Sequence, residues 1–515
     1  MPTAFTGGRV LTMDPGLTGA TVVLVDGDRI AAVGGRELVA AHPDAEVIDL
    51  GGAVLIPGFI DAHNHLSVAA LHPRWHDVAS VRDRAVLIDA IRSQDAAEPE
   101  TAWIRCQGLD TQAFPLTRHD LDAAAVDRPV MVADYTLHQC VVSSAALDAL
   151  GIGRDTVDPP GGEIARDQAG EPTGLLIERA WSEAHARSMR DYADPDRWPL
   201  HIAARARTLI ADGITCVHDA ACSPEAEATY RAMARAGTLP IGVLGLPHPA
   251  ALLMNDPGSR LDGPPTGDGD EGFRTGPAKL FADGGVAIAL DTSIGGHPLK
   301  MGMLFGDLAE HAQRAVARGF RIAIHAMGNQ GVQAMIDTCT DIERRHPDDD
   351  HRFRIEHAGV TGTDQWHRLA ELGAVAVVQP GFVEHVGTSA GGLRFDDHHW
   401  LAFAGLAEAG VTLAGSSDDP CAPPPPLWGA THGLTRRTDA GVDFEPAQSV
   451  SFDDWLAAYT RGAAFAGGQE RERGSLTPGK RADFVVLDCA DVGARILETW
   501  IGGTCVFRAG PAPDR

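Results

Sequence analysis

Six side chains that could bind metal ions follow short apolar runs at intervals along the chain. Imidazole and carboxylate groups together are typical ligands of zinc or another divalent first-row metal. One histidine pair would mean little in a chain with 22 histidines. Four histidines and an acid that recur at the ends of successive runs predict a metal site, formed by His63, His65, Lys279, His325, His357 and either Asp418 or Asp419.

The spacing of the first two histidines supports this prediction. His63 and His65 are two residues apart in the run AVLIPGFIDAHNH. Alternate residues of a β-strand project to the same face, so both imidazoles can reach one ion while Asn64 points away.

Lys279 is unusual because the chain has only three lysines, Lys279, Lys300 and Lys480, among 43 basic residues. A lysine amine, unlike a guanidinium, can lose its proton and react. It can then add CO2 to form a carbamate, whose two oxygens can bridge two metal ions. The reference pKa is about 10.4, so burial beside divalent cations must favour deprotonation. Alternatively, Lys279 stays protonated and pairs with Asp283 or a substrate carboxylate, and one ion is bound by the four histidines and Asp418.

Eight apolar runs alternate with helical stretches, a pattern that indicates βα units and a parallel sheet. Eight such units predict an α/β fold, a (β/α)8 or TIM barrel, whose catalytic groups lie at the C-terminal ends of the strands. The predicted metal-binding residues fall at these ends. The runs cover residues 53–65, 214–220, 239–246, 278–285, 320–328, 353–359, 374–380 and 411–419.

Three further regions surround the predicted barrel of residues 53–467. Residues 1–52 and 468–515 both contain short strands with turn residues and are predicted to pair into one domain. Residues from about 66 to 205 do not fit the repeat and are too long for a structureless loop. We expect them to form a subdomain inserted after the first barrel strand, which would wall the active site.

The net charge, the cysteines and the N-terminus argue against several classes of partner and location. The 515 residues carry a formal net charge of -27, which disfavours nucleic acid and anionic membranes as partners. The eight cysteines form no C-x-x-C motif, and the N-terminus does not resemble a signal peptide. A cytoplasmic enzyme acting on a small molecule is predicted, and a homodimer is a reasonable expectation for its size.

Several motifs resemble the amidohydrolase superfamily and, more closely, its amidohydrolase-3 branch, which includes N-substituted formamide deformylases. The resemblance implies a distorted barrel flanked by a β-sandwich that both chain ends build. It also implies that His63, His65 and Asp418 hold one metal ion, most readily Zn²⁺, and that His325 and His357 hold another, with carboxylated Lys279 bridging. The motifs are PGFIDAHNH (57–65), AKLFADGG (278–285), HAMGNQG (325–331), RIEHAG (354–359), GSSDDP (415–420) and the tail at 459–488.

The implied reaction is hydrolysis of the C–N amide bond of an N-substituted formamide or another N-acyl amine. A metal-activated hydroxide attacks the carbonyl carbon, and Asp418 relays a proton to the departing amine. The family pattern favours Asp418 over Asp419, because the ligand comes first after the strand. The alternatives are a cyclic amidase or deaminase of the same superfamily, or a non-catalytic barrel that binds a small molecule. Deaminases usually have a glutamate where this chain has Gly328.

Four further residues are predicted to contact the substrate. His138 belongs to YTLH, which replaces the DGH common in this branch, and it is equally well read as a packed structural histidine. His218 could instead support the barrel through hydrogen bonds. Asp283 could orient Lys279 or a ligand histidine. His297 lies in a predicted loop near the same face, where most histidines are simply solvated.

Overall fold

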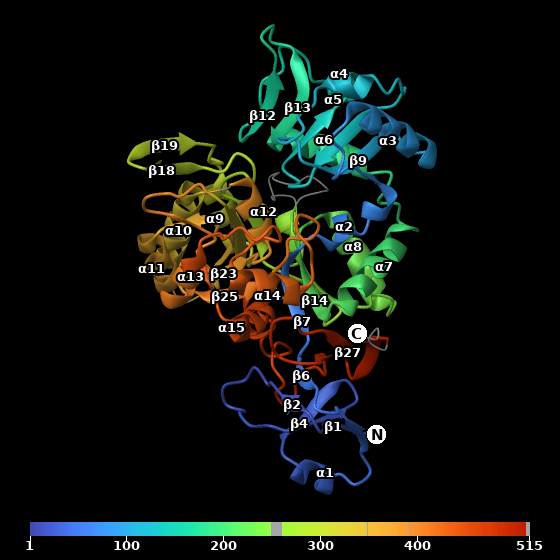
Figure 1. Ribbon diagram of the computed structural model, residues 1–515, viewed down its shortest axis with the longest axis vertical. Helices are drawn as coiled ribbons and strands as arrows, with labels where there is room; N and C mark the ends of the chain where they lie inside the picture. Colours follow the sequence, from blue (N-terminus) through green and yellow to red (C-terminus); the bar gives the residue numbers. More distant parts are fainter. Residues whose placement is uncertain (249–259, 348, 391, 511–515) are drawn as a thin grey trace.

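The computed structural model describes residues 1–248, 260–347, 349–390 and 392–510 (Figure 1). Two parallel sheets form its centre, and each of the eight predicted runs contributes a strand to one of them. The first has the order β16-β15-β14-β7, with β7 (Phe59–Asn64), β14 (Ile214–Cys222), β15 (Gly242–Pro247) and β16 (Phe273–Thr275). The second has the order β17-β20-β21-β23-β25, with β17 (Ala278–Phe281), β20 (Ile322–Ala326), β21 (Arg354–His357), β23 (Val375–Val378) and β25 (Thr412–Gly415).

The predicted α/β fold is confirmed, although within the described residues the two sheets do not close into one continuous barrel. They approach each other where β7 and the segment after β25 form an isolated parallel bridge between Asn64 and Asp419. β16 was not predicted, because three residues are too few to carry a periodic signal.

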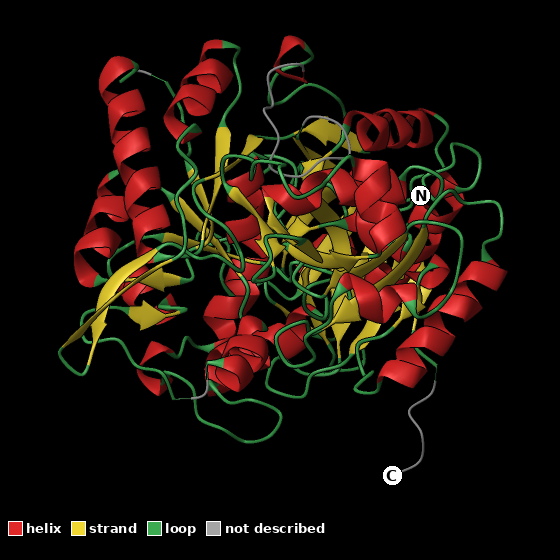
Figure 2. Cartoon of the chain, turned by 90° about the horizontal axis from the view of Figure 1, so that it is seen from above, coloured by secondary structure: helices red, strands yellow, loops and turns green. Residues whose placement is uncertain are grey.

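Helices surround the central strands (Figure 2). α8 shows ordinary capping chemistry at its start: the Ser223 hydroxyl accepts a hydrogen bond from the N–H of Ala226, and Pro224 occupies the first turn. The helices that connect or cover these strands are α7 (Trp198–Ala211), α8 (Pro224–Arg235), α9 (Leu308–Ala317), α10 (Asn329–Arg345), α11 (Thr363–Glu371), α12 (Phe382–Ser389), α13 (Phe403–Glu408), α14 (Pro426–Thr435), α15 (Phe452–Ala457) and α16 (Ala463–Gly467).

Strands from both chain ends lie together below the parallel sheets in Figure 1. Phe5 joins them, because its ring packs edge-on against Phe484 and Trp500 at centroid distances of 4.8 and 5.0 Å. One sheet contains β1 (Thr3–Thr6), β3 (Val22–Asp26), β4 (Arg29–Gly34) and β5 (Glu46–Asp49). The other contains β2 (Arg9–Val10), β6 (Val54–Pro57), β26 (Phe484–Leu487), β27 (Ile496–Ile501) and β28 (Thr504–Arg508).

The segment after β7 forms a six-stranded sheet at the opposite end of the molecule (Figure 1). It has an apolar cluster of its own, which includes Ile91, Ile104 and Val132. Its strands are β8 (His76–Asp77), β9 (Ile104–Leu109), β10 (Val130–Asp134), β11 (Gln139–Val142), β12 (Gly162–Arg166) and β13 (Pro172–Glu178), and its helices are α3 (Arg84–Ala97), α4 (Arg118–Asp122), α5 (Ser144–Leu150) and α6 (Arg179–Met189).

The remaining elements are short. No helix in the described ranges is both long and apolar enough to cross a membrane. The remaining α-helices and strands are α1 (Glu37–Ala41), α2 (Leu66–Ala69), the hairpin of β18 (Leu290–Ile294) and β19 (His297–Met301), and the pair β22 (Val360–Thr361) and β24 (His399–Trp400).

Candidate active site

The residues predicted to bind metal line one buried cavity at the C-terminal ends of the parallel strands. β7 and the turn after it supply the first two histidines, β17 supplies the lysine, and β20, β21 and the loop after β25 supply the others. The structure thus brings together His63, His65, Lys279, His325, His357 and Asp418.

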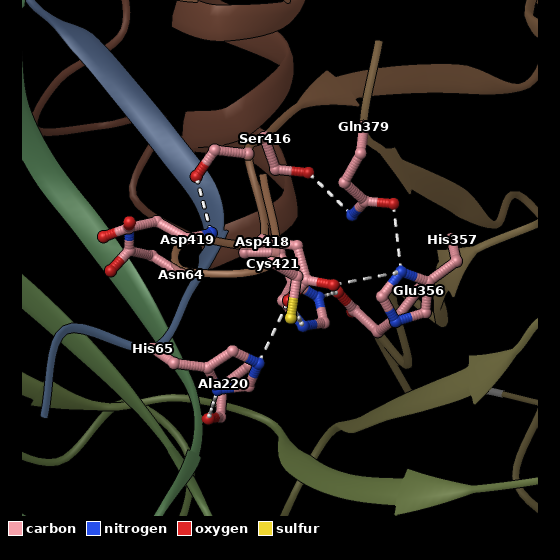
Figure 3. Close-up of polar contacts among 12 residues, drawn as sticks. Asn64, His65, Ala220, Glu356, His357, Gln379, Ser416, Asp418, Asp419 and Cys421 are labelled. Atoms are coloured by element: carbon pink, nitrogen blue, oxygen red, sulfur yellow. Dashed lines mark hydrogen bonds and ion pairs between the residues drawn. The ribbon is translucent and has the colours of Figure 1, made fainter. Parts of the chain in front are cut away.

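Asp418 lies between His65 and His357 (Figure 3). Its Oδ1 atom is 3.0 Å from His65 Nε2 and 3.4 Å from His63 Nε2. The ligand atoms of His63, His357 and Asp418 all lie within 4.8 Å of one another. The neighbouring Asp419 instead forms an ion pair with Arg205, so the geometry favours Asp418 as the acid of the site.

The backbone around β7 and β25 sets this arrangement. The N–H of Asp418 donates to the carbonyl of His63 over 2.7 Å, and the N–H of His65 donates to the carbonyl of Asp419 over 2.8 Å. Asp418 and His357 both have positive φ, at 64° and 76°, a conformation that Asp and His adopt more readily than most residues. β21 ends at His357, Asp418 lies in the loop after β25, and both side chains line the cavity.

Each of three imidazoles uses Nδ1 to contact an acceptor away from the cavity. His63 contacts Glu356 at 2.6 Å, His65 contacts the carbonyl of Ala220 at 2.8 Å, and His357 contacts Gln379 at 2.9 Å. Because these partners accept hydrogen bonds, Nδ1 carries the proton and Nε2 has a free lone pair, the tautomer that metal-binding histidines commonly have.

Burial favours the protonation states that a metal site requires. It lowers the pKa of His63 to about 4 and that of His357 to about 3, and it lowers the pKa of Lys279 to about 8. Burial alone would raise the pKa of Asp418, but His63 and His65 hold it below its ordinary value. Two neutral imidazoles therefore face an ionised carboxylate near neutral pH.

Two polar atoms of the site lack a partner. Asp418 Oδ1 and His325 Nε2 are buried and, within the described residues, make no hydrogen bond of good geometry. Asp418 raises the pKa of His65 despite the opposing effect of burial. When no cation is bound, a proton on His65 Nε2 can therefore interact with Asp418 Oδ1. Buried atoms without partners are costly, and their convergence with free Nε2 atoms fits a divalent cation.

The sequence prediction missed the buried ion pair that supports His63. Glu356 accepts from Arg354 Nε at 2.9 Å as well as contacting His63, and the side chains of Glu356 and Arg354 are fully buried. The two residues alternate along β21 and share one face. The R-x-E pattern before His357 is the sequence feature from which this buried pair could have been predicted.

The four predicted substrate contacts separate into two groups. His138 lines the cavity. Asp283 is buried and accepts from the N–H groups of Ala289, Met327 and Gly328, so it fixes loops near His325; burial raises its pKa to about 7.

Asp283, His218 and His297 do not line the cavity. His218 is buried between Arg354 and Gln469, 3.1 and 3.2 Å away, which favours a supporting role. His297 is exposed at the β18–β19 turn. The alternative pairing of Lys279 with Asp283 is not found among the described residues: the carboxylates that act on Lys279 are Glu356 and Asp418.

A larger cavity of about 330 Å³ adjoins the first. His138, His325, His357 and Asp418 line both cavities. Apolar side chains from the β18–β19 hairpin, from α12 and from the segments around them dominate the remaining wall, among them Ile288, Leu290, Leu299, Phe382, Val386 and Trp400. The polar centre thus continues into an apolar chamber.

The parallel sheets carry a cluster of possible metal ligands at their C-terminal ends, and comparison with known proteins gives the family of the chain. The profile of the amidohydrolase family matches residues 46–507. The chain belongs to the amidohydrolase family and is a hydrolase that acts on C–N bonds, as the sequence predicts.

Individual relatives span nearly the whole chain. N-substituted formamide deformylase from Arthrobacter pascens is 34% identical over 96% of this chain and 96% of its own. The putative amidohydrolase YtcJ from Bacillus subtilis is 28% identical over 93% of each chain. A metal-dependent hydrolase from Pyrococcus horikoshii has a similar fold, with a TM-score of 0.74, 22% identity and coverage of 95% of this chain and 98% of its own.

The buried Arg354–Glu356 pair makes a prediction about stability. Glu356→Gln removes the charge that balances Arg354, so we expect the free energy of unfolding to fall by about 3 kcal/mol or more. Chemical denaturation measures the change. Glu183→Gln is the control, because Glu183 pairs with Arg187 on the surface and its loss should cost less than about 1 kcal/mol. Equal losses of stability in both variants would contradict the assignment of Arg354 and Glu356 as a buried ion pair.

Proposed function

We propose that this protein is a metal-dependent amidase that hydrolyses N-acyl amines, with N-substituted formamides as the first class to test. The observation that carries the proposal is the convergence of His63, His357 and Asp418 beside an apolar chamber. The 34% identity to a formamide deformylase supports the choice of substrate.

We assign the metal ligands by combining the geometry with the family pattern. His63, His65 and Asp418 would hold one divalent ion, and His325 and His357 a second, with Lys279 as a bridging carbamate. Zinc is the preferred ion, because imidazole and carboxylate suit it and because atrazine chlorohydrolase TrzN, a structural neighbour with a TM-score of 0.52, was solved with zinc. When bound, such ions polarise a carbonyl group and lower the pKa of water.

The chain's own groups would orient the substrate and move the proton. The carboxylate of Asp418 accepts a proton from the attacking water and passes it to the nitrogen of the departing amine, which makes the amine a better leaving group. The small inner cavity suits a short acyl group, while the adjoining apolar chamber suits the substituent on nitrogen.

The deaminase alternative is disfavoured by the packing at Gly328. A Cβ atom there would lie 2.0 Å from the carbonyl oxygen of Ala289. The glutamate typical of the deaminases therefore has no room without a shift of the backbone. A cyclic amidase differs from an N-acyl amidase in its product, since ring opening releases no separate amine.

The finer architecture belongs to the same proposal. We infer a distorted barrel in residues 53–467 that closes between β7 and β25, a β-sandwich from residues 1–52 and 468–515, and an inserted subdomain at about 66–205. The packing of Phe5 against Phe484 and Trp500 supports a sandwich built from both chain ends, and β6 (Val54–Pro57), just after its first segment, pairs with β26 in it. A cytoplasmic location and a homodimer remain predictions from the sequence.

The test of function is product release from a panel of N-formyl and N-acetyl amines with small or aromatic substituents. Enzyme reconstituted with zinc and bicarbonate should release equal amounts of carboxylic acid and amine. Removal of metal with a chelator should abolish turnover, and added zinc should restore it. Asp418→Asn should lose about 100-fold or more in kcat, because general acid–base catalysis contributes at least that much. Acid from no member of the panel would contradict the proposed substrate class.

Lys279→Arg tests the carbamate separately. Arginine keeps the positive charge and a similar bulk but cannot add CO2. We expect loss of most turnover and a fall in metal affinity beyond the roughly 10- to 100-fold that supporting residues contribute. Lys300→Arg is the matched control, because the side chain of Lys300 is 81% exposed and the change should alter neither property. Near-normal activity and metal content in Lys279→Arg would refute the carbamate.

A further inference from the structure

A second group of possible metal ligands lies outside the candidate active site, where α12 meets α14 and the turn that follows it. The group comprises Glu384 of α12, His432 of α14 and Asp439 of the turn. Each residue offers one ligand atom, and the three atoms all lie within 4.8 Å of one another. One imidazole and two carboxylates form a donor set that suits zinc and other divalent first-row ions.

The ring of His432 is held with one nitrogen toward the two carboxylates. Its Nδ1 atom lies 2.8 Å from the carbonyl oxygen of Arg437. Because a carbonyl can only accept, Nδ1 carries the proton and Nε2 has a free lone pair. The side chain is only 7% exposed, and its ring packs edge-on against Trp428 at a centroid distance of 4.3 Å. A buried imidazole of fixed orientation therefore offers a ligand atom to this group.

The distance between His432 and Asp439 fits a shared ion better than a hydrogen bond. His432 Nε2 is 3.5 Å from Asp439 Oδ1, whereas N–H···O hydrogen bonds in proteins measure about 2.7–3.2 Å. Two ligands of a tetrahedral zinc ion, each about 2.0–2.1 Å from the metal, lie roughly 3.4 Å apart. Nε2 makes no hydrogen bond within the described part of the chain. A lone pair that faces a carboxylate is repelled by it, and a cation between the two removes this repulsion.

Glu384 supplies the third ligand and holds the turn in place. Its Oε2 atom accepts a hydrogen bond from the backbone N–H of Asp439. A carboxylate has about four lone-pair positions, so Glu384 can accept this bond and also bind an ion. The side chain of Asp439 is 72% exposed, so water can reach the group and complete the coordination.

α12 connects this group to the apolar chamber. Phe382 and Val386 of α12 line the chamber. On another face of the helix, Gly387 packs closely against the turn, since a Cβ atom there would lie 2.8 Å from the side chain of Thr438. α12 has only eight residues, and helices of this length depend on tertiary contacts for stability. An ion that joins α12 to α14 would therefore fix one wall of the chamber.

We propose that Glu384, His432 and Asp439 form an additional binding site for a divalent first-row metal ion such as Zn²⁺, and that this ion holds α12 in place as a wall of the apolar chamber. The site shares no residue with the candidate active site. Binding of the ion does not depend on the reaction. The effect on the substrate rests on the proposed amidase function.

Zinc titration of the whole protein tests the site. Protein that has been loaded with zinc in the inner cavity and freed of excess metal should bind one further zinc ion per chain, as measured by calorimetry. Excess Mg²⁺ in the buffer suppresses binding to scattered carboxylates, because Mg²⁺ prefers oxygen ligands. His432→Asn keeps a donor for the Arg437 carbonyl and removes Nε2. It should weaken the further binding by at least roughly 10- to 100-fold, the effect that even residues around metal ligands have.

Asp439→Ala is the second variant, because an exposed side chain can be removed without loss of the fold. It should weaken the further zinc binding as His432→Asn does, and the zinc content of the inner cavity should not change in either variant. Asp443→Ala is the matched control. Asp443 lies in the same turn with its side chain 66% exposed, but it pairs with Arg437. The control makes the same change of charge and should bind zinc like the wild type.

Two N-substituted formamides test the role of α12, one with a methyl and one with an aromatic substituent. In Asp439→Ala we expect KM for the aromatic substrate to rise about threefold or more while kcat changes little, as for a loss of uniform binding. KM for the methyl substrate should stay the same, because a methyl group fills little of the chamber. Both substrates should behave in Asp443→Ala as they do in the wild type.

The outcomes separate the site from its role and from the reaction. A wild type that binds no further zinc, or variants at His432 and Asp439 that bind it as the wild type does, would overturn the site. Loss of zinc binding with no change in KM for the aromatic substrate would overturn the role of the ion in fixing α12. A wild type that releases no acid and amine would overturn the amidase function, while the zinc titration would still decide whether the site exists.

Discussion

The contact between β7 and the segment after β25 is the constraint on which the site depends. The Asp61 carboxylate accepts from the backbone N–H and the hydroxyl of Ser417, over 2.9 and 2.5 Å. It also accepts from Asn64, whose amide therefore faces away from the cavity. Burial raises the pKa of Asp61 to about 7, against the effect of Ser417 and Asn64. This buried junction holds the first and last parallel strands in one register, and the register brings the His63 and Asp418 side chains together.

Burial of charge then sets the chemistry. Lys279, Arg354 and Glu356 are all buried around the histidines, where an unbalanced charge is costly. Arg354 balances Glu356, but Lys279 has no carboxylate of its own within hydrogen-bonding distance among the described residues, and its pKa is lowered. A lysine that can lose its proton, facing neutral imidazoles, is the arrangement that carbamate formation requires.

Much of this site could be predicted from the sequence because strand periodicity is local. The two-residue spacing of His63 and His65, and the recurrence of histidines at the ends of apolar runs, depend only on residues close in the chain. The choice of Asp418 needed the family pattern, and the geometry agrees with it because Asp419 faces Arg205. The exposed position of His297 agrees with the alternative that loop histidines are simply solvated, and the β18–β19 hairpin that carries it lies at the edge of the molecule (Figure 1).

The features of the site that the sequence did not predict depend on contacts between distant segments. His138 contacts Glu178, which lies 40 residues away in the chain, and the two meet only because β11 and β13 pair. The positive φ values of His357 and Asp418 occur at the end of β21 and in the loop after β25, and no residue pattern encodes them. The approach of the two sheets to each other likewise depends on the junction at Asp61, whose partner Ser417 is 356 residues away.

The most direct test of the account is anomalous diffraction from crystals of zinc-loaded protein, measured on both sides of the zinc absorption edge. The account predicts two peaks in the inner cavity, one among His63, His65 and Asp418 and the other beside His325 and His357, with density for a carboxylate on Lys279 between them. No peak in this cavity, or a single peak with Lys279 ending at Nζ, would contradict the binuclear centre.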